Sequence, residues 1–150
     1  MDGQREVFDI VGTYTCTVDS KGRVMIPAKF RHSIPSDLKN VLIITKSKDR
    51  CLNLYPLNHW RNVVMGKLAD LKPSKMKKDL SRYYSANSAQ VNIDKAGRIA
   101  IPPRFLAELG NPKKVVIVGM LSYMEIWSPE KYKIAEEEAV KTYMESDWEL

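Results

Sequence analysis

Two short stretches of the sequence place an aspartate, a glycine and an arginine at the same spacing. Residues 19–23 read DSKGR and residues 94–98 read DKAGR. In such a turn the aspartate accepts backbone hydrogen bonds and the glycine supplies a positive φ angle. The turn itself does not need the arginine. An Asp–Arg pair would orient the guanidinium, which can also bind a phosphate or the edge of a guanine.

These residue types divide into two candidate roles. A single D-x-x-G-R match is a weak signal, because short motifs arise by accident and a tight turn explains them. The same motif in both halves of one chain carries more weight. The candidate turn-orienting residues are Asp19, Gly22, Asp94 and Gly97, and the first candidates for nucleic-acid contact are Arg23 and Arg98.

The two turns belong to a longer internal repeat. Residues 19–30 align without gaps on residues 94–105, and six of the twelve positions are identical. A repeat of this kind indicates two copies of one structural unit.

Each copy has the same expected order of elements: strand, turn, strand, short helix, strand, strand. The alternation of "TYTCTV" is typical of a half-buried strand, and a proline suits the first turn of the short helix. In the first copy the expected elements are strands at 13–18 and 23–26, a helix at 27–34, and strands at 40–47 and 51–56. In the second copy they are strands at 89–93 and 98–101, a helix at 102–109, and strands at 113–120 and 123–128.

Longer helices are expected outside this β core. Apolar residues recur at helical spacing in residues 57–72, a second helix is expected at 74–85, and a third begins after Pro129. Short strands bury little alone, so we expect both copies to pair into one sheet system. The expected fold class is α+β, with a mainly β core from two pseudo-repeats and peripheral helices.

Composition limits the class of protein. The chain has 150 residues and a formal net charge of +6, while residues 125–150 hold eight acids against three lysines. A basic body fits a polyanionic partner, although solubility alone also explains it. No apolar run reaches the roughly 18 residues that cross a bilayer, and residues 1–11 do not resemble a signal peptide, so we expect an intracellular protein.

The sequence offers little for catalysis or metal binding. His32 and His59 are its two histidines, and no common catalytic motif is present. We expect His59 to pack or face solvent, and Cys16 and Cys51 to be buried, reduced thiols. An arginine beside Asp19 and another beside Asp94 would keep both carboxylates ionised. We therefore expect no enzyme activity, metal or cofactor.

The quoted residues resemble the MraZ family, bacterial proteins made of two fused SpoVT/AbrB-like units. The stretches that carry the resemblance are "GTYTCTVDSKGRVMIP", "RYYSANSAQVNIDKAGRIAIPPRF" and "VVIVGMLSYMEIWSPEKY". Together they extend the similarity over about residues 8 to 133. The resemblance implies a double-ψ or swapped-hairpin AbrB-like barrel. It divides the chain into a first unit at 8–60, a helical connector at 61–86, a second unit at 87–133 and a C-terminal helix at 134–150.

The resemblance also implies a function. MraZ-like proteins form homo-oligomeric rings and regulate transcription of the division and cell-wall gene cluster, their own promoter included. Such a protein would be cytoplasmic and nucleoid-associated, and it would bind double-stranded DNA at promoter direct repeats. On this chain the implied DNA-binding residues are Lys21, Arg23, Lys95 and Arg98, with Ala96 where a counterpart of Lys21 would stand. The alternative is an antitoxin-like AbrB module that binds a protein partner as well as DNA.

Overall fold

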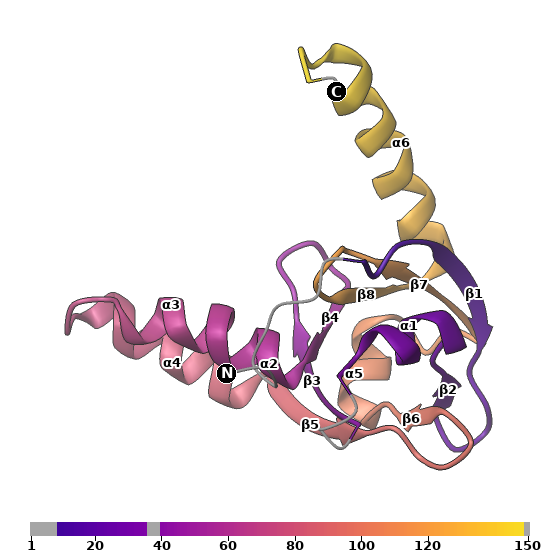
Figure 1. Cartoon of the computed structure of the whole chain (residues 1–150), viewed down its shortest axis with the longest axis horizontal. Coiled ribbons are helices and arrows are strands. Elements are labelled where there is room, and N and C mark those ends of the chain that lie inside the picture. The colour runs from indigo at the N-terminus through magenta and orange to yellow at the C-terminus, as the bar shows by residue number, and fades with distance from the viewer. Residues whose placement is uncertain (1–8, 36–39, 149–150) are drawn as a thin grey trace.

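The computed structural model describes residues 9–35 and 40–148 and has an α+β architecture. Six strands form one antiparallel sheet in the order β1-β7-β8-β4-β3-β5, and two more form a separate ribbon, β2-β6 (Figure 1). The large sheet contains β1 (Thr13–Thr17), β3 (Val41–Lys46), β4 (Leu52–Pro56), β5 (Ser88–Asn92), β7 (Lys114–Gly119) and β8 (Met124–Trp127). The ribbon contains β2 (Arg23–Met25) and β6 (Arg98–Ala100).

The sheet mixes strands of the two repeats. The first strand of each repeat pairs with the other repeat: β1 pairs with β7, and β5 pairs with β3. The last strands of the two repeats, β4 and β8, also pair with each other. The prediction that the two copies pair with each other is therefore confirmed, although their strands form two separate sheets and not one.

Two short helices lie at equivalent places in the repeats. α1 (Ala28–Ser33) follows Pro27, and α5 (Pro103–Glu108) follows Pro102. The proline φ angles of −51° and −55° suit a helix start. Phe30 and Phe105, which occupy equivalent positions in these helices, are both fully buried. The two repeats thus contribute matching side chains to one apolar core.

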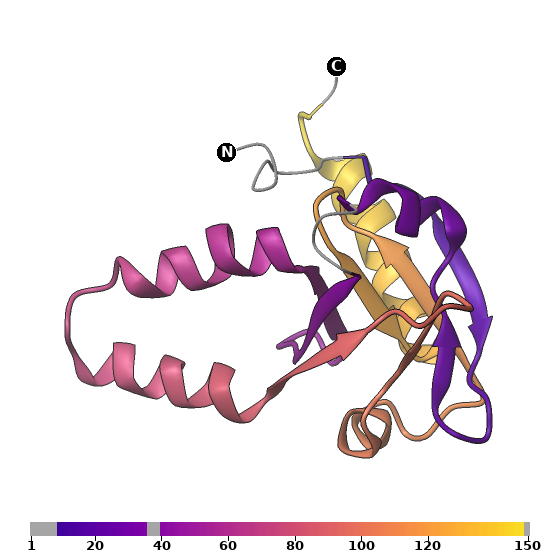
Figure 2. The same cartoon turned by 60° about the horizontal axis from the view of Figure 1, so that its bottom comes forward.

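The remaining helices project from this core. The segment after β4 runs through α2 (Leu57–His59), a wider π-helical turn η3 (Trp60–Val64) and α3 (Met65–Ala69), and α4 (Lys75–Ala86) returns beside it. This helical hairpin and the C-terminal helix α6 (Pro129–Glu145) leave the β core in different directions (Figures 1 and 2). None of the residues of α3, α4 or α6 is fully buried.

The expected elements are confirmed within a few residues at each end, and the predicted α+β class with them. A closed barrel is not confirmed: β1 and β5 end the order of the large sheet, which therefore stays open. Cys51 is buried as expected, whereas Cys16 packs against the core but is only partly buried, because β1 is an edge strand whose other residues are exposed. No helix within the described residues is long and apolar enough to span a membrane.

The four segment boundaries stay predictions. Residue 8, where the first unit was expected to start, lies outside the described residues, as does most of the N-terminal stretch considered for a signal peptide. The helices themselves begin at Leu57 and Pro129, a few residues before the boundaries at 61 and 134.

Candidate nucleic-acid interface

The first turn is held together by the Asp19 side chain. Its Oδ1 accepts hydrogen bonds from the backbone N–H groups of Lys21 at 2.9 Å and Arg23 at 2.8 Å. Its Oδ2 accepts from Nε of Arg23 at 2.8 Å. One carboxylate therefore fixes both the loop backbone and the guanidinium at its exit.

The second turn repeats this geometry. Oδ1 of Asp94 accepts from the backbone N–H groups of Ala96 and Arg98, both at 2.9 Å. Oδ2 of Asp94 accepts from Nε of Arg98 at 3.2 Å. The side chains of Arg23 and Arg98 are 32% and 33% exposed, so the repeats present the two arginines alike.

The glycines place each turn against the other repeat. Gly22 has a φ of +77° and Gly97 a φ of +86°. The carbonyl of Gly22 accepts from the Ile101 N–H at 3.0 Å, and the carbonyl of Gly97 accepts from the Ile26 N–H at 2.9 Å. Each motif is therefore anchored by backbone of the opposite repeat.

Electrostatics keep both carboxylates ionised. The pKa of Asp19 falls to about 2, first because the Arg23 N–H donates to it, with the guanidinium adding to the effect. The pKa of Asp94 is also lowered, mainly by the Arg98 N–H. Both ion pairs thus persist at neutral pH, where each arginine remains an oriented cation.

The ribbon brings the two arginines to one face. In the register of β2 and β6, Arg23 lies opposite Ala100 and Met25 lies opposite Arg98. The central pair, Val24 and Ile99, is buried, so these four flanking residues share the outer face. The structure thus places Arg23 and Arg98 as diagonal neighbours on one surface.

The two predicted lysines are not brought together. Lys21 and Lys95 are both exposed, but each lies in its own turn. Because β2 and β6 are antiparallel and each follows its turn directly, the turns lie at opposite ends of the ribbon. Any bound polyanion would meet one lysine at each end and the arginines between them.

Sequence reasoning missed two neighbours of these motifs. The guanidinium of Arg31 lies over the second turn, where a Cβ on Gly97 would be 2.7 Å from its Cζ. The matching position over Gly22 is taken by Leu106. Met25 is exposed between the arginines. In the alignment of the two repeats, Arg31 stands where the second repeat has Leu106. This difference was the signal in the sequence that could have pointed to Arg31.

This surface presents two oriented guanidinium groups, which carry positive charge and donate hydrogen bonds. Each motif arginine uses Nε for its aspartate, and the guanidinium carries further N–H donors on its two Nη atoms. Such a group can bind a phosphate or the O6 and N7 atoms of guanine.

His59 lies outside this surface. It is buried and stacks on Tyr55 and Tyr123, as expected for a packing role.

Comparison with known proteins identifies the family. The model of the family described as "MraZ protein, putative antitoxin-like" matches residues 10–77 and 85–147. The chain belongs to the MraZ family. The resemblance drawn from the doubled motif is thereby confirmed.

Curated members of this family are similar over most of their length. The protein named transcriptional regulator MraZ from Lachnoclostridium phytofermentans is 37% identical over 123 residues, 82% of this chain and 84% of the relative. The protein of the same name from Caldanaerobacter subterraneus is 37% identical over 125 residues, 83% and 84% of the two chains. That from Limosilactobacillus fermentum is 34% identical over 134 residues, 89% and 90% of the two chains.

Proposed function

We propose that this chain is a sequence-specific DNA-binding transcriptional regulator. The observation that carries the proposal is the outer face of the β2-β6 ribbon, where two aspartate-oriented arginines lie side by side. The names of the curated relatives, transcriptional regulators, point the same way. The absence of enzyme activity is part of the same proposal.

The four predicted contact residues suit the two components of DNA recognition. Lys21 and Lys95 are exposed at the ends of the ribbon, where they would neutralise phosphates without reading sequence. Arg23 and Arg98 would reach base edges, because a two-stranded ribbon fits the major groove. A good bidentate arginine–guanine contact discriminates against the wrong base by about 1–3 kcal/mol.

The finer features implied by the family complete this proposal. The backbone bonds from Ile26 to Gly97 and from Ile101 to Gly22 support a swapped-hairpin arrangement of two SpoVT/AbrB-like units. One ribbon offers few base contacts, so a homo-oligomeric ring would gain affinity on promoter direct repeats through effective concentration. The proposed target lies upstream of the division and cell-wall genes, and the proposed location is the cytoplasmic nucleoid.

Chromatin immunoprecipitation in the native host tests this function. The tagged wild type is expected to enrich DNA upstream of its own gene, and an Arg23→Ala/Arg98→Ala chain at equal abundance is expected to lose that enrichment. Arg82→Ala is the matched control, because Arg82 also pairs with an aspartate but lies on α4. Equal enrichment by the double variant would refute DNA contact through the ribbon.

A second candidate function is an antitoxin-like module with a protein partner. The family description itself favours it. Affinity purification of the tagged chain from its host would then recover a small protein in stoichiometric amount. Recovery of this chain and DNA alone would reject the second candidate.

A further inference from the structure

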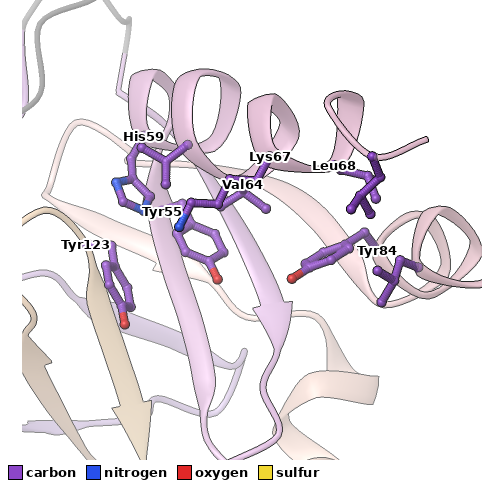
Figure 3. A pocket seen from close by; sticks show the side chains of 10 residues that line it. Tyr55, His59, Val64, Lys67, Leu68, Tyr84 and Tyr123 are labelled. Carbon is purple, nitrogen blue, oxygen red and sulfur yellow. The ribbon is translucent and has the colours of Figure 1, made fainter. Parts of the chain in front are cut away.

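The helical hairpin carries an apolar groove. Figure 3 shows it between the two arms of the hairpin, with Tyr55 and Tyr123 of the β core at its inner end. Its volume is about 500 Å³. The side chains along its walls are only half-buried: Val63, Val64, Leu68, Leu71, Leu80 and Tyr84. These two helices face each other with apolar sides, and residues 9–35 and 40–148 place no third layer over them. Such a surface favours a further apolar element.

The outer half of α6 has a matching apolar stripe. Val140, Tyr143 and Met144 follow the i, i+3, i+4 spacing that places side chains on one helix face. Val140 is 58% exposed and Tyr143 is 59% exposed. The base of the helix differs, since Tyr132 and Ala135 pack against Trp127. The stripe is therefore fixed in space by its base but left open along its outer half.

The charges of the two surfaces are complementary. Residues 57–86, which form the hairpin, hold seven basic and two acidic side chains. Residues 129–148, which include α6, hold six acidic and three basic ones. Lys67 lines the groove, and Glu136 and Glu137 lie one turn before the stripe. Opposite charge around apolar contact favours association of these two surfaces over self-association of either.

One chain cannot join its own two surfaces. Both views show α6 and the hairpin leaving the β core in different directions, and the base of α6 is held on β8 by Trp127 (Figures 1 and 2). We propose that the outer half of α6 docks in the hairpin groove of a second copy. This inference rests on the proposed homo-oligomer and names its interface. Because two different patches meet, the contact is heterologous and builds a ring wherever its rotation closes.

Size-exclusion chromatography with light scattering, without DNA, tests this contact. Wild type is expected at a multiple of the 17.2 kDa chain mass, and Val140→Glu/Tyr143→Glu at the mass of one chain. Ile134→Glu is the matched control, since Ile134 is 59% exposed on α6 but lies nearer its base and outside the stripe, and it is expected to keep the wild-type mass. Circular dichroism verifies that each variant stays folded.

A mixing experiment makes the test specific for a groove-to-helix contact. Lys67→Glu and Leu68→Glu alter the groove, and each is expected to yield single chains. A groove variant mixed with the α6 variant retains one intact surface from each partner, so the mixture is expected to form dimers of twice the chain mass. Single chains in the mixture, a monomeric wild type, or an α6 variant with the wild-type mass would each overturn the proposal. DNA binding through Arg23 is measured separately, so failure here does not affect it.

Discussion

Arg23 and Arg98 are diagonal neighbours on the outer face of the β2-β6 ribbon, although 75 positions separate them in the sequence. Diagonal neighbours in an antiparallel pair lie about 7–8 Å apart. Each arginine is tethered through Nε to the aspartate of its own turn. A single chain thus presents two oriented guanidinium groups as one recognition element, and loss of either should affect the same DNA contact.

The exposed lysine of the first turn leads to a prediction about salt dependence. On B-DNA each neutralised phosphate adds about 0.9 to the slope of log affinity against log salt. We expect Lys21→Ala to lower that slope by about 0.9, and Ala96→Lys, which supplies the missing counterpart, to raise it by a similar amount. Titrations of labelled promoter DNA at several salt concentrations measure the slope. An unchanged slope in both variants would mean that these positions do not meet phosphate.

Gly97 and Gly110 give a matched pair for a prediction about stability. Both have positive φ angles, +86° and +81°, so alanine strains both by about 1–2 kcal/mol. A Cβ on Gly97 would also collide with Arg31, whereas no atom of the described residues lies within 4 Å of a Cβ on Gly110. We expect Gly97→Ala to lower the free energy of unfolding more than Gly110→Ala, as measured by urea denaturation.

Arg31 provides the control for that comparison. In an Arg31→Ala background the collision disappears, so Gly97→Ala is expected to cost only the backbone strain seen at Gly110. A cost that stays unchanged in this background would show that the close approach of Arg31 is not the cause.

The lowered pKa of Asp19 predicts a dependence of stability on pH. The pKa is about 2 in the folded chain and 3.8 for a free aspartate, so the unfolded state binds the proton more readily. The ionised carboxylate therefore stabilises the fold fully above about pH 4, and this contribution is lost as the pH falls towards 2. Asp19→Asn is expected to be less stable than wild type at neutral pH and to lose less stability between pH 4 and 2. Urea denaturation measures the free energy of unfolding of both proteins at each pH. An equal loss in wild type and in Asp19→Asn between pH 4 and 2 would contradict this prediction.

Much of the fold was predictable from local signals in the repeat. Prolines at 27 and 102 marked the starts of α1 and α5, and the D-x-x-G-R turns marked the strands on either side. These features depend on residues close together in the sequence. The two candidate aspartates and arginines were found for the same reason.

The relation between the repeats was not predictable in this way. The pairing of Arg23 with Ala100, and the approach of Arg31 to Gly97, depend on contacts between distant segments. No local pattern fixes such a register, because several pairings would bury the same alternating residues. The apolar groove of the hairpin was likewise invisible, since helical periodicity predicts an apolar face but not what covers it.

The measurement that tests the central claim most directly is a titration of the DNA upstream of the chain's own gene. Wild type, Arg23→Ala, Arg98→Ala and the control Arg82→Ala would be compared at two salt concentrations, with light scattering and circular dichroism on each protein. We expect each ribbon variant to bind about 5- to 150-fold more weakly, as loss of a contact worth about 1–3 kcal/mol implies, while fold and assembly persist and Arg82→Ala binds normally. Normal binding by Arg23→Ala and Arg98→Ala would contradict recognition through the ribbon, as would loss of binding that only accompanies unfolding.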